Sequence, residues 1–281
     1  TGVAAARELV PNTERHNGRA NKANDAIPSR FTLPSPPLMP AALLLIDVQS
    51  DFLPPAGALA VPDGDAILPF VHRLLDDDVK WSSVYVSQDF HPAGHISFAS
   101  RHAPPAQPFD TIAIRHPICG DTIQQELWPD HCVQGTPGCA IEEGVATRLE
   151  QIRQKRGDDA VRVVQKGRDA DLDAYSAFAL TLGEQQAGLD SVAESRLGRL
   201  LKASPSLDTI VVAGLALDFC VQQTIADLVK VRDSLKRDWR ILVVEEAVRG
   251  VDPARDAEVK RRLEEERVEF LSIDALSAVL A

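Results

Sequence analysis

The stretch Ile210-Val-Val-Ala-Gly-Leu-Ala-Leu-Asp-Phe-Cys220-Val-Gln-Gln-Thr-Ile-Ala-Asp-Leu228 decides the fold of this chain. Its first four residues are all apolar, which predicts a strand that is buried on both faces. Gly214 ends this run, and Asp218 is placed to cap the helix that follows. The apolar stripe of that helix consists of Val221, Ile225, Leu228 and Val229. A buried strand that leads directly into a helix is typical of α/β proteins.

Cys220 falls in the first turn of this helix, just beyond the carboxyl end of the strand. Backbone N–H groups and the helix dipole favour an anion at that place, so we expect the thiol to ionise more easily than a free one. The same turn offers N–H groups to an oxyanion, which is an arrangement typical of a nucleophile. The alternative is a small buried residue that fills the helix start, because free cysteines are among the most buried residues. The stretch alone does not decide between these two interpretations.

Similar patterns recur along the chain and predict its fold class. The expected strands are 41–46, 82–87, 161–164, 210–213, 241–244 and 268–273. Besides the helix after Asp218, the expected helices are 64–77, 139–155, 177–182, 191–203, 254–266 and a last short one, and 96–138 reads as a long loop. Strands that alternate with helices predict an α/β fold with an open, mainly parallel six-stranded sheet. Helices should cover both faces of the sheet, as in a Rossmann-like three-layer sandwich.

The first 40 residues differ in composition from the rest. They are rich in Ala, Asn, Arg and Pro, show no sustained periodicity, and end in the proline-rich run 33–40. This composition is typical of a flexible segment. We therefore expect an N-terminal extension over 1–40 and a single domain over 41–281.

Composition and charge narrow the functional classes. The hydrophobic fraction of 44% and the charged fraction of 25% are those of a soluble globular protein. A net charge of −11 argues against nucleic acid or an anionic membrane as partner. The partner that we expect is a small-molecule substrate. The sequence does not decide whether the protein forms a homo-oligomer. No apolar run approaches the roughly 20 residues of a membrane span, and no secretory signal pattern is visible. The four cysteines are too irregularly spaced for a disulfide framework, so we expect a reduced cytoplasmic or nuclear compartment.

Four polar residues stand at or just beyond the carboxyl ends of successive expected strands: Asp47, Asp89, Lys166 and Cys220. In an open α/β sheet this edge is where ligands bind. Asp47 close to Cys220 could take the thiol proton and return it to a leaving group. Lys166 would stay charged in a buried position only through such partners. The aromatic residues that could enclose a flat ring near the same edge are Phe52, Trp128 and Tyr175.

A second cluster has the residue types of a metal site. In extended backbone, Asp89 and His91 point the same way and can share one ion. His131, which arrives on a distant loop, could complete the site, and His95 stands four residues after His91. A carboxylate with imidazoles suits Zn, Fe(II) or Mn, and the sequence does not choose among them. The alternative is a hydrogen-bonded polar turn, because Asp-x-His alone is a common pattern.

Taken together, these motifs resemble the nicotinamidase branch of the isochorismatase-like cysteine hydrolases, from about Ala41 to the C-terminus. The resemblance is carried, in the order of the family, by Leu45-Ile-Asp-Val-Gln-Ser-Asp-Phe52, Gln88-Asp-Phe-His-Pro-Ala-Gly-His-Ile-Ser-Phe98, Trp128-Pro-Asp-His-Cys-Val-Gln-Gly-Thr136, Lys166-Gly167, Asp173-Ala-Tyr-Ser-Ala-Phe178 and Gly214-Leu-Ala-Leu-Asp-Phe-Cys-Val221. Each motif alone is weak, and their common order makes the resemblance specific.

The resemblance implies roles for these residues. Its catalytic triad falls on Asp47, Lys166 and Cys220, and its oxyanion hole on the N–H groups of Ala216 and Cys220 after a cis peptide at Leu215–Ala216. One divalent metal ion, Zn before Fe or Mn, is expected on Asp89, His91 and His131, with His95 a further ligand in some members. The substrate ring is expected between Phe52, Trp128, Tyr175 and Leu215.

The implied activity is deamidation of nicotinamide to nicotinate and ammonia through a cysteine thioester, in NAD salvage, with pyrazinamide as a second substrate. The alternatives are another isochorismatase-like hydrolase that acts on a different small amide and a non-catalytic binding protein of the same fold. Isochorismatases generally lack the nucleophilic cysteine, and a non-catalytic protein should have lost part of the triad.

Overall fold

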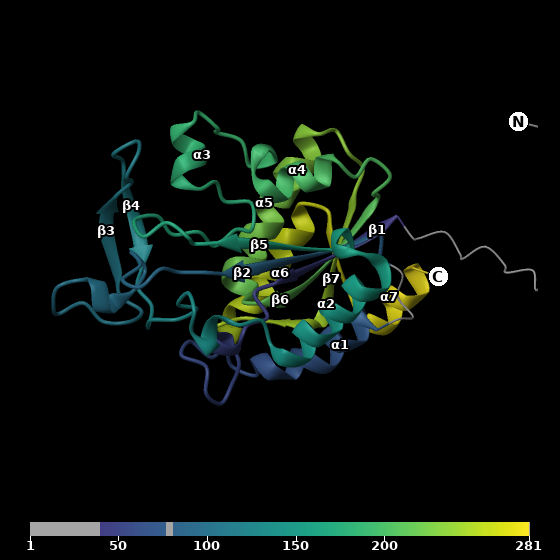
Figure 1. Cartoon of the computed structure of the whole chain (residues 1–281), viewed down its shortest axis with the longest axis horizontal. Coiled ribbons are helices and arrows are strands. Elements are labelled where there is room, and N and C mark those ends of the chain that lie inside the picture. The colour runs from purple at the N-terminus through teal and green to yellow at the C-terminus, as the bar shows by residue number, and fades with distance from the viewer. Residues whose placement is uncertain (1–39, 77–80, 281) are drawn as a thin grey trace, which may run out of the picture. The chain divides into compact units, whose positions relative to one another are not determined.

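The computed structural model describes residues 40–76 and 81–280 (Figure 1). The expected N-terminal extension lies outside the described residues except for Pro40, so the division at residue 40 stays a prediction. Position 77, where the first helix was expected to end, also lies outside them.

Six strands form one sheet in the order β5-β2-β1-β6-β7-β8, and every neighbouring pair is parallel. The strands are β1 Ala41–Ile46, β2 Ser83–Asp89, β5 Val161–Lys166, β6 Thr209–Leu215, β7 Arg240–Arg249 and β8 Val268–Leu271. All residues of β1 and β6 are buried, because both strands lie in the middle of the sheet with neighbours and helices on either side. The predicted α/β class and the six-stranded parallel sheet are confirmed.

Helices cover both faces of the sheet (Figure 1). One face carries α1 Leu68–Leu75, α2 Glu143–Arg156 and α7 Ile273–Val279. The other carries α4 Arg196–Lys202, α5 Gln222–Ser234 and α6 Asp256–Glu265, while α3 Leu182–Gln186 buries no side chain. Single turns of 3₁₀ helix lie at Ser50–Phe52, Gly64–Ile67, Ala99–Arg101, Pro137–Cys139, Asp158–Ala160, Val192–Glu194 and Pro253–Arg255.

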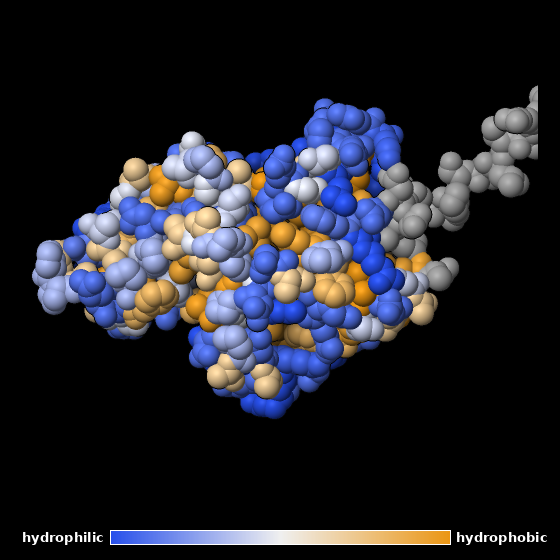
Figure 2. Space-filling view, turned by 90° about the horizontal axis from the view of Figure 1, so that it is seen from below, coloured by the Kyte–Doolittle hydropathy of each residue, from blue (hydrophilic) through white to orange (hydrophobic). Residues whose placement is uncertain are grey.

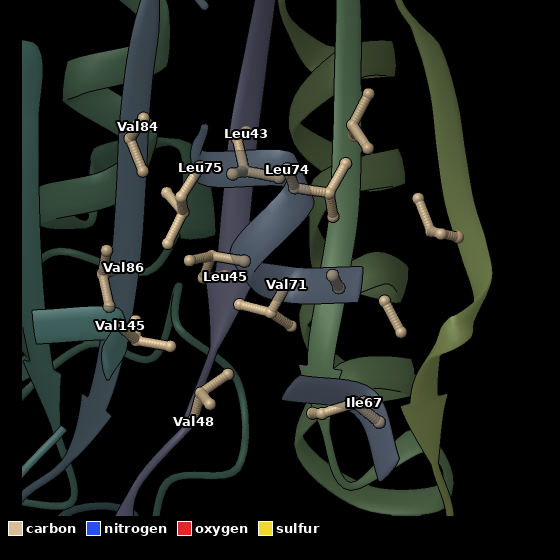
Figure 3. Close-up of a cluster of buried hydrophobic side chains, with 14 of the residues drawn as sticks. Leu43, Leu45, Val48, Ile67, Val71, Leu74, Leu75, Val84, Val86 and Val145 are labelled. Carbon is tan, nitrogen blue, oxygen red and sulfur yellow. The ribbon is translucent and has the colours of Figure 1, made fainter. Parts of the chain in front are cut away.

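The side chains of β1 alternate between two hydrophobic cores. Leu43 and Leu45 face the α1 and α2 layer, where they meet Val71 and Leu74 of α1 (Figure 3). Leu44 packs on the opposite face with residues of α4, α5 and α6. Period-two alternation in a strand covered on both sides explains why its sequence is a continuous apolar run. Packing of the two cores holds the sheet in place, and the sheet in turn positions the edge at which its strands end.

Gly214 lets β6 approach β1 closely near that edge. Its φ angle is +129°, and a Cβ there would lie 2.0 Å from the backbone oxygen of Ile46. Only glycine accommodates both demands. The pairing of β6 with β7 also shifts its register between Val212 and Gly214. The backbone irregularity therefore falls just before the segment that leads to Cys220.

The expectation of a long loop without strands over 96–138 is wrong in part. It contains a two-stranded antiparallel sheet of β3 Thr111–Arg115 and β4 Thr122–Glu126, set apart from the main sheet (Figure 1). The register pairs Thr111 with Glu126. These strands could not be recognised in the sequence because each has five residues, nearly all of them exposed or partly exposed, and prolines lie nearby.

Two expected helices are also wrong in part. Residues 177–181 form no helix, and α3 begins only at Leu182, where Thr181 and Glu184 form a capping box. The helix expected over 191–203 is interrupted, because the Ser195 side chain accepts a hydrogen bond from the N–H of Gly198 and so caps a separate helix, α4.

In the described part of the chain, the helices are all too short or too polar to cross a lipid bilayer. The face in Figure 2 mixes hydrophilic residues with apolar patches. Such a mixture is ordinary for globular proteins.

Candidate active site

The four strand-end residues predicted from the sequence meet at one edge of the sheet. Asp89 and Lys166 are the last residues of the adjacent strands β2 and β5 and lie opposite each other in the register. Asp47 follows β1 directly, and Cys220 follows β6. Because β5, β2, β1 and β6 are neighbours in the sheet, the four side chains converge. This convergence was the main structural expectation of the sequence analysis, and it is confirmed.

Lys166 lies at the centre of this group and is almost completely buried. Its Nζ lies 3.0 Å from Oδ2 of Asp47, 3.0 Å from Oδ1 of Asp89 and 3.4 Å from Sγ of Cys220. Nζ also donates a hydrogen bond to the carbonyl oxygen of Ala174. Burial alone would lower the pKa of Lys166, but the charges of Asp47 and Asp89 raise it well above its ordinary value. Lys166 therefore stays positively charged, as expected.

Asp47 is fully buried and held in place by Ser87. The Ser87 hydroxyl donates to Oδ1 of Asp47 at 2.7 Å, and the Asp47 N–H donates to the same hydroxyl at 3.2 Å. Burial raises the pKa of Asp47 although Lys166 lowers it. Oδ2 of Asp47, apart from its ion pair with Lys166, has no hydrogen-bond partner in the described part of the chain. It is thus available as a proton acceptor.

Cys220 lies in a π-helical turn, Leu217–Val221, that precedes α5. Such turns occur often at functional sites. Burial raises the pKa of the Cys220 thiol well above its ordinary value; Lys166 lowers this pKa, and Asp47 and Asp89 raise it further. The expectation that this thiol would ionise more easily than a free one is therefore wrong. A base must remove the proton, and Asp47 is one of the two carboxylates whose charges act on this thiol.

Asp218 does not cap the helix, which corrects a second expectation. Its carboxylate is fully buried and accepts hydrogen bonds from the N–H groups of Val251 at 2.8 Å and Asp252 at 3.0 Å. The carboxylate thus ties the turn of Cys220 to the loop after β7.

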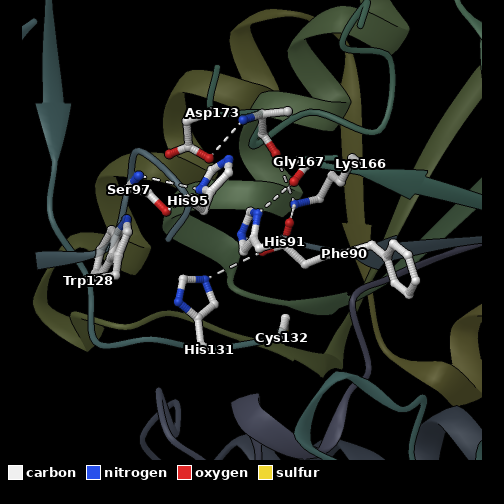
Figure 4. Close-up of polar contacts among 12 residues, drawn as sticks. Phe90, His91, His95, Ser97, Trp128, His131, Cys132, Lys166, Gly167 and Asp173 are labelled. Atoms are coloured by element: carbon white, nitrogen blue, oxygen red, sulfur yellow. Dashed lines mark hydrogen bonds and ion pairs between the residues drawn. The ribbon is translucent and has the colours of Figure 1, made fainter. Parts of the chain in front are cut away.

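Three buried side chains form a group that can hold a divalent metal ion: Asp89, His91 and His131. Their ligand atoms all lie within 4.8 Å of one another. Nε2 of His91 lies 3.0 Å and Nε2 of His131 lies 3.6 Å from Oδ2 of Asp89. Figure 4 shows the two imidazoles close to each other, and their ring centroids lie 5.0 Å apart in an edge-to-face arrangement. The sequence prediction that these three residues converge is confirmed.

The hydrogen bonds of the two Nδ1 atoms are compatible with metal binding through Nε2 of His91 and His131. Nδ1 of His91 lies 2.9 Å from the carbonyl oxygen of Gly167, and Nδ1 of His131 lies 2.8 Å from that of Pro129. A carbonyl only accepts, so each Nδ1 carries a proton and each Nε2 is left with a lone pair facing a carboxylate. Buried lone pairs in this arrangement need a cation between them or a proton on one ring. The charge of Asp89 does raise the pKa of His91 against the effect of burial.

His95 is placed differently. Its ring stacks on that of His91 with 4.0 Å between centroids, but Nδ1 lies 2.7 Å from the Ser97 hydroxyl and Nε2 lies 3.2 Å from the carbonyl oxygen of Leu172. Both nitrogens thus have partners other than a metal. Burial, followed by the neighbouring His91, lowers the pKa of His95 to about 4. His95 and His91 also lie near Asp173 in a second group of donor atoms.

A cavity that is partly open to solvent lies over Cys220 and the group of Asp89, His91 and His131. Its walls include three aromatic residues predicted for a ring pocket, Phe52, Trp128 and Tyr175, as well as Ala216 and Cys220. The Trp128 indole N–H donates to the Tyr175 hydroxyl at 3.0 Å. A mostly apolar cavity with a few polar groups suits a small molecule.

Leu215 does not line this cavity. It is fully buried and packs towards Gly64, because neighbouring residues of a strand point to opposite faces. The peptide Leu215–Ala216 is cis, as the resemblance implied. The Ala216 carbonyl accepts hydrogen bonds from the N–H groups of Phe219 and Val221, which hold the π-helical turn of Cys220 against the end of β6.

Several residues of the cavity wall were not predicted from the sequence: Leu59, Val61, Ser97, Asp173, Phe219 and Val251. Phe219 packs edge-to-face on Trp128, with 4.9 Å between ring centroids. It stands beside Cys220 in the sequence, so its place could have been predicted. The others lie in irregular segments without periodicity, which only the tertiary fold brings together.

The fold is that of the isochorismatase-like hydrolases. A solved structure of an isochorismatase-like hydrolase from Alkaliphilus metalliredigens has the same fold, with a TM-score of 0.55 and 17% identity over 86% of this chain and 99% of that one. Comparison with models of protein families gives no match.

Proteins with higher sequence identity identify the family within this fold class. The nicotinamidase of Escherichia coli is 34% identical over 214 residues, which are 76% of this chain and 84% of the relative. The crystal structure of the yeast nicotinamidase bound to the inhibitor nicotinaldehyde has a TM-score of 0.68 and 27% identity, and covers 83% of this chain and 99% of that one. The chain belongs to the nicotinamidase family.

Proposed function

We propose that this protein hydrolyses the carboxamide of nicotinamide to nicotinate and ammonia, with Cys220 as nucleophile. The observation that carries the proposal is the position of Lys166, whose Nζ lies 3.4 Å from Sγ of Cys220 and 3.0 Å from Oδ2 of Asp47, beside an aromatic cavity. Membership of the nicotinamidase family supports the choice of substrate. Pyrazinamide, which is also a flat heteroaromatic amide, is the second substrate that we propose.

The first half of the reaction forms a thioester. Asp47 takes the proton from the Cys220 thiol, and the charge of Lys166 stabilises the thiolate. The sulfur attacks the carboxamide carbon, and the negative charge moves to the carbonyl oxygen, which the N–H groups of Ala216 and Cys220 receive. Loss of one such donor costs about 3 kcal/mol of transition-state stabilisation in related acyl transfers. The carbon–nitrogen bond then breaks, and Asp47 gives its proton to the leaving ammonia.

The second half regenerates the enzyme. A water molecule gives a proton to Asp47 and attacks the thioester carbon, which passes again through an oxyanion. The carbon–sulfur bond breaks, and the thiolate of Cys220 regains the proton from Asp47. The nicotinic acid that forms loses its own proton to water and leaves as nicotinate. The raised pKa of Asp47 suits this alternation between base and acid.

We propose that Asp89, His91 and His131 hold one zinc ion, with Fe(II) and Mn as alternatives. Buried imidazole and carboxylate donors suit these metals. When bound, the ion supplies positive charge that can orient the ring of the substrate and polarise water. The partners of both His95 nitrogens favour three protein ligands over four.

The proposal is tested by measuring ammonia and acid formation from nicotinamide, pyrazinamide and an aliphatic amide of similar size. We expect release from the two aromatic amides and at least about a hundredfold lower kcat/KM for the aliphatic one, because it lacks a ring for the cavity walls. Preferred hydrolysis of the aliphatic amide would assign another substrate to this fold. No release from any amide by zinc-loaded protein would favour the non-catalytic alternative.

A further inference from the structure

One carboxylate in the cavity wall has no role in the chemistry described above. Asp173 lines the cavity and is half-buried. Its Oδ2 accepts a hydrogen bond from Nε2 of Gln125 at 2.8 Å, and its Oδ1 accepts one from the N–H of Ala174 at 2.8 Å. Both donors are neutral, so they hold the carboxylate without cancelling its charge.

This distinguishes Asp173 from the other acidic residues of the site. Asp47 and Asp89 both pair with the ammonium of Lys166 at 3.0 Å. Among the residues that the structure describes, no lysine or arginine side chain forms an ion pair with Asp173. Its charge acts on the cavity wall: after burial, Asp173 is the main cause that raises the pKa of Tyr175 well above its ordinary value.

The hydrogen bond from Gln125 shows that another part of the fold holds the Asp173 carboxylate in place. Gln125 lies on β4, and it is the one buried residue of the two short strands β3 and β4, which are otherwise exposed or partly exposed. A buried amide needs partners, and Gln125 uses its Nε2 for the carboxylate of Asp173. The small β3–β4 sheet thus fixes Asp173 in the cavity, where Figure 4 shows it beside His95.

We infer that Asp173 makes the cavity discriminate against the acid product in favour of the neutral amide, and so promotes product release. The inference rests on the proposed function. Substrate and product have nearly the same shape, so the walls alone cannot tell them apart, but the product carries one more negative charge. A carboxylate in the cavity wall that pairs with no lysine or arginine of the described residues repels that product, and such repulsion gives specificity without a new attractive contact.

The test compares the affinities of nicotinate and nicotinamide for zinc-loaded protein by calorimetry. Cys220→Ala is the background, so that nicotinamide is not consumed, and Asp173→Asn removes the charge from that background. We expect nicotinate to bind at least about tenfold more tightly after Asp173→Asn, whereas the affinity for nicotinamide changes less than about threefold. If the asparagine variant folds poorly, Asp173→Ser is a second variant that removes the charge.

Asp171→Asn is the matched control, because Asp171 is exposed, lies outside the cavity and pairs with Arg101. It removes the same charge two residues away and should leave both affinities unchanged. Unchanged nicotinate affinity after Asp173→Asn, or equal tightening for acid and amide, would overturn the inference. Failure of the proposed function would appear separately, as absence of ammonia release from nicotinamide by the wild-type protein.

Discussion

At the scale of single residues, Lys166 organises the site. Three buried acidic groups depend on it, namely the carboxylates of Asp47 and Asp89 and the thiol of Cys220. Lys166 is the one group among them that lowers the pKa of the thiol. It pairs with two carboxylates, so its own charge is retained despite burial. The cysteine is therefore ready to lose its proton only in the presence of a base.

Asp47→Asn tests that base. Asparagine keeps the size of the side chain but cannot take a proton, so kcat for nicotinamide should fall by about 10²–10⁴-fold. KM should change little, because Asp47 lies behind Lys166 and is not part of the cavity wall. The measurement is steady-state ammonia release.

Asp51→Asn is the matched control for this substitution. Asp51 accepts the N–H groups of Ala58 and Cys132 and has no contact with Cys220 among the interactions of the described residues. If Asp47→Asn retained wild-type kcat, another group would have to be the base.

The sequence predicted the convergence of Asp47, Lys166 and Cys220 better than it predicted their ionisation. Asp47, Lys166 and Cys220 could be found because each follows an apolar run, and strand ends of a parallel sheet meet at one edge. The pKa of Cys220 could not be predicted, because it depends on how deeply the thiol is buried and on which carboxylates surround it. The direction of the Leu215 side chain could not be predicted either: it packs towards Gly64 and does not line the cavity.

At the scale of elements, the turn after β5 supports the metal-ligand group. Gly167 has a φ angle of +61°, and its carbonyl oxygen accepts Nδ1–H of His91. A Cβ at Gly167 would lie 2.3 Å from Cε1 of His91. The turn therefore sets the orientation of this imidazole and leaves no room for a larger residue.

Gly167→Ala should weaken metal binding. The methyl group displaces the His91 ring, and loss of such supporting contacts lowers metal affinity by about 10–100-fold. The measurement is zinc affinity by competition with a chelator. Gly120→Ala is the control, since its φ angle of +73° imposes similar backbone strain but a Cβ there meets nothing within 4 Å. Equal zinc affinity in the two variants would show that His91 is not held by this turn.

The main strands and most helices could be predicted because their apolar patterns are long and regular. The β3–β4 sheet could not, since its strands have five residues each, with little burial, in a proline-containing segment. Its contribution to the cavity through Gln125 is a long-range contact with Asp173 and leaves no local pattern. The capping role expected for Asp218 failed likewise, because the N–H groups of the loop after β7 compete for its carboxylate.

At the scale of the whole molecule, the site is assembled from segments that are far apart in the sequence. The triad, the metal-ligand group and the cavity walls come from residues between Asp47 and Val251. Loss of the sheet would separate all of them, so metal binding and folding should be thermodynamically linked.

Removal of the metal should therefore lower thermal stability as well as activity. A ligand at 100 times its Kd stabilises the folded state by about 2.7 kcal/mol, so the melting temperature should fall after chelation and recover with added zinc. His131→Ala should melt at nearly the same temperature with and without zinc, because one of three ligands is missing. A melting temperature of the wild-type protein that does not respond to zinc would argue against a metal at this site.

The central claim is that Cys220 is the nucleophile of an amide hydrolysis. It is tested most directly by ammonia release from nicotinamide by zinc-loaded Cys220→Ala, with zinc content and nicotinamide binding measured on the same preparation. The account predicts that the variant retains zinc and binds nicotinamide but loses at least about a thousandfold in kcat. Wild-type turnover by this folded, zinc-loaded variant would contradict it.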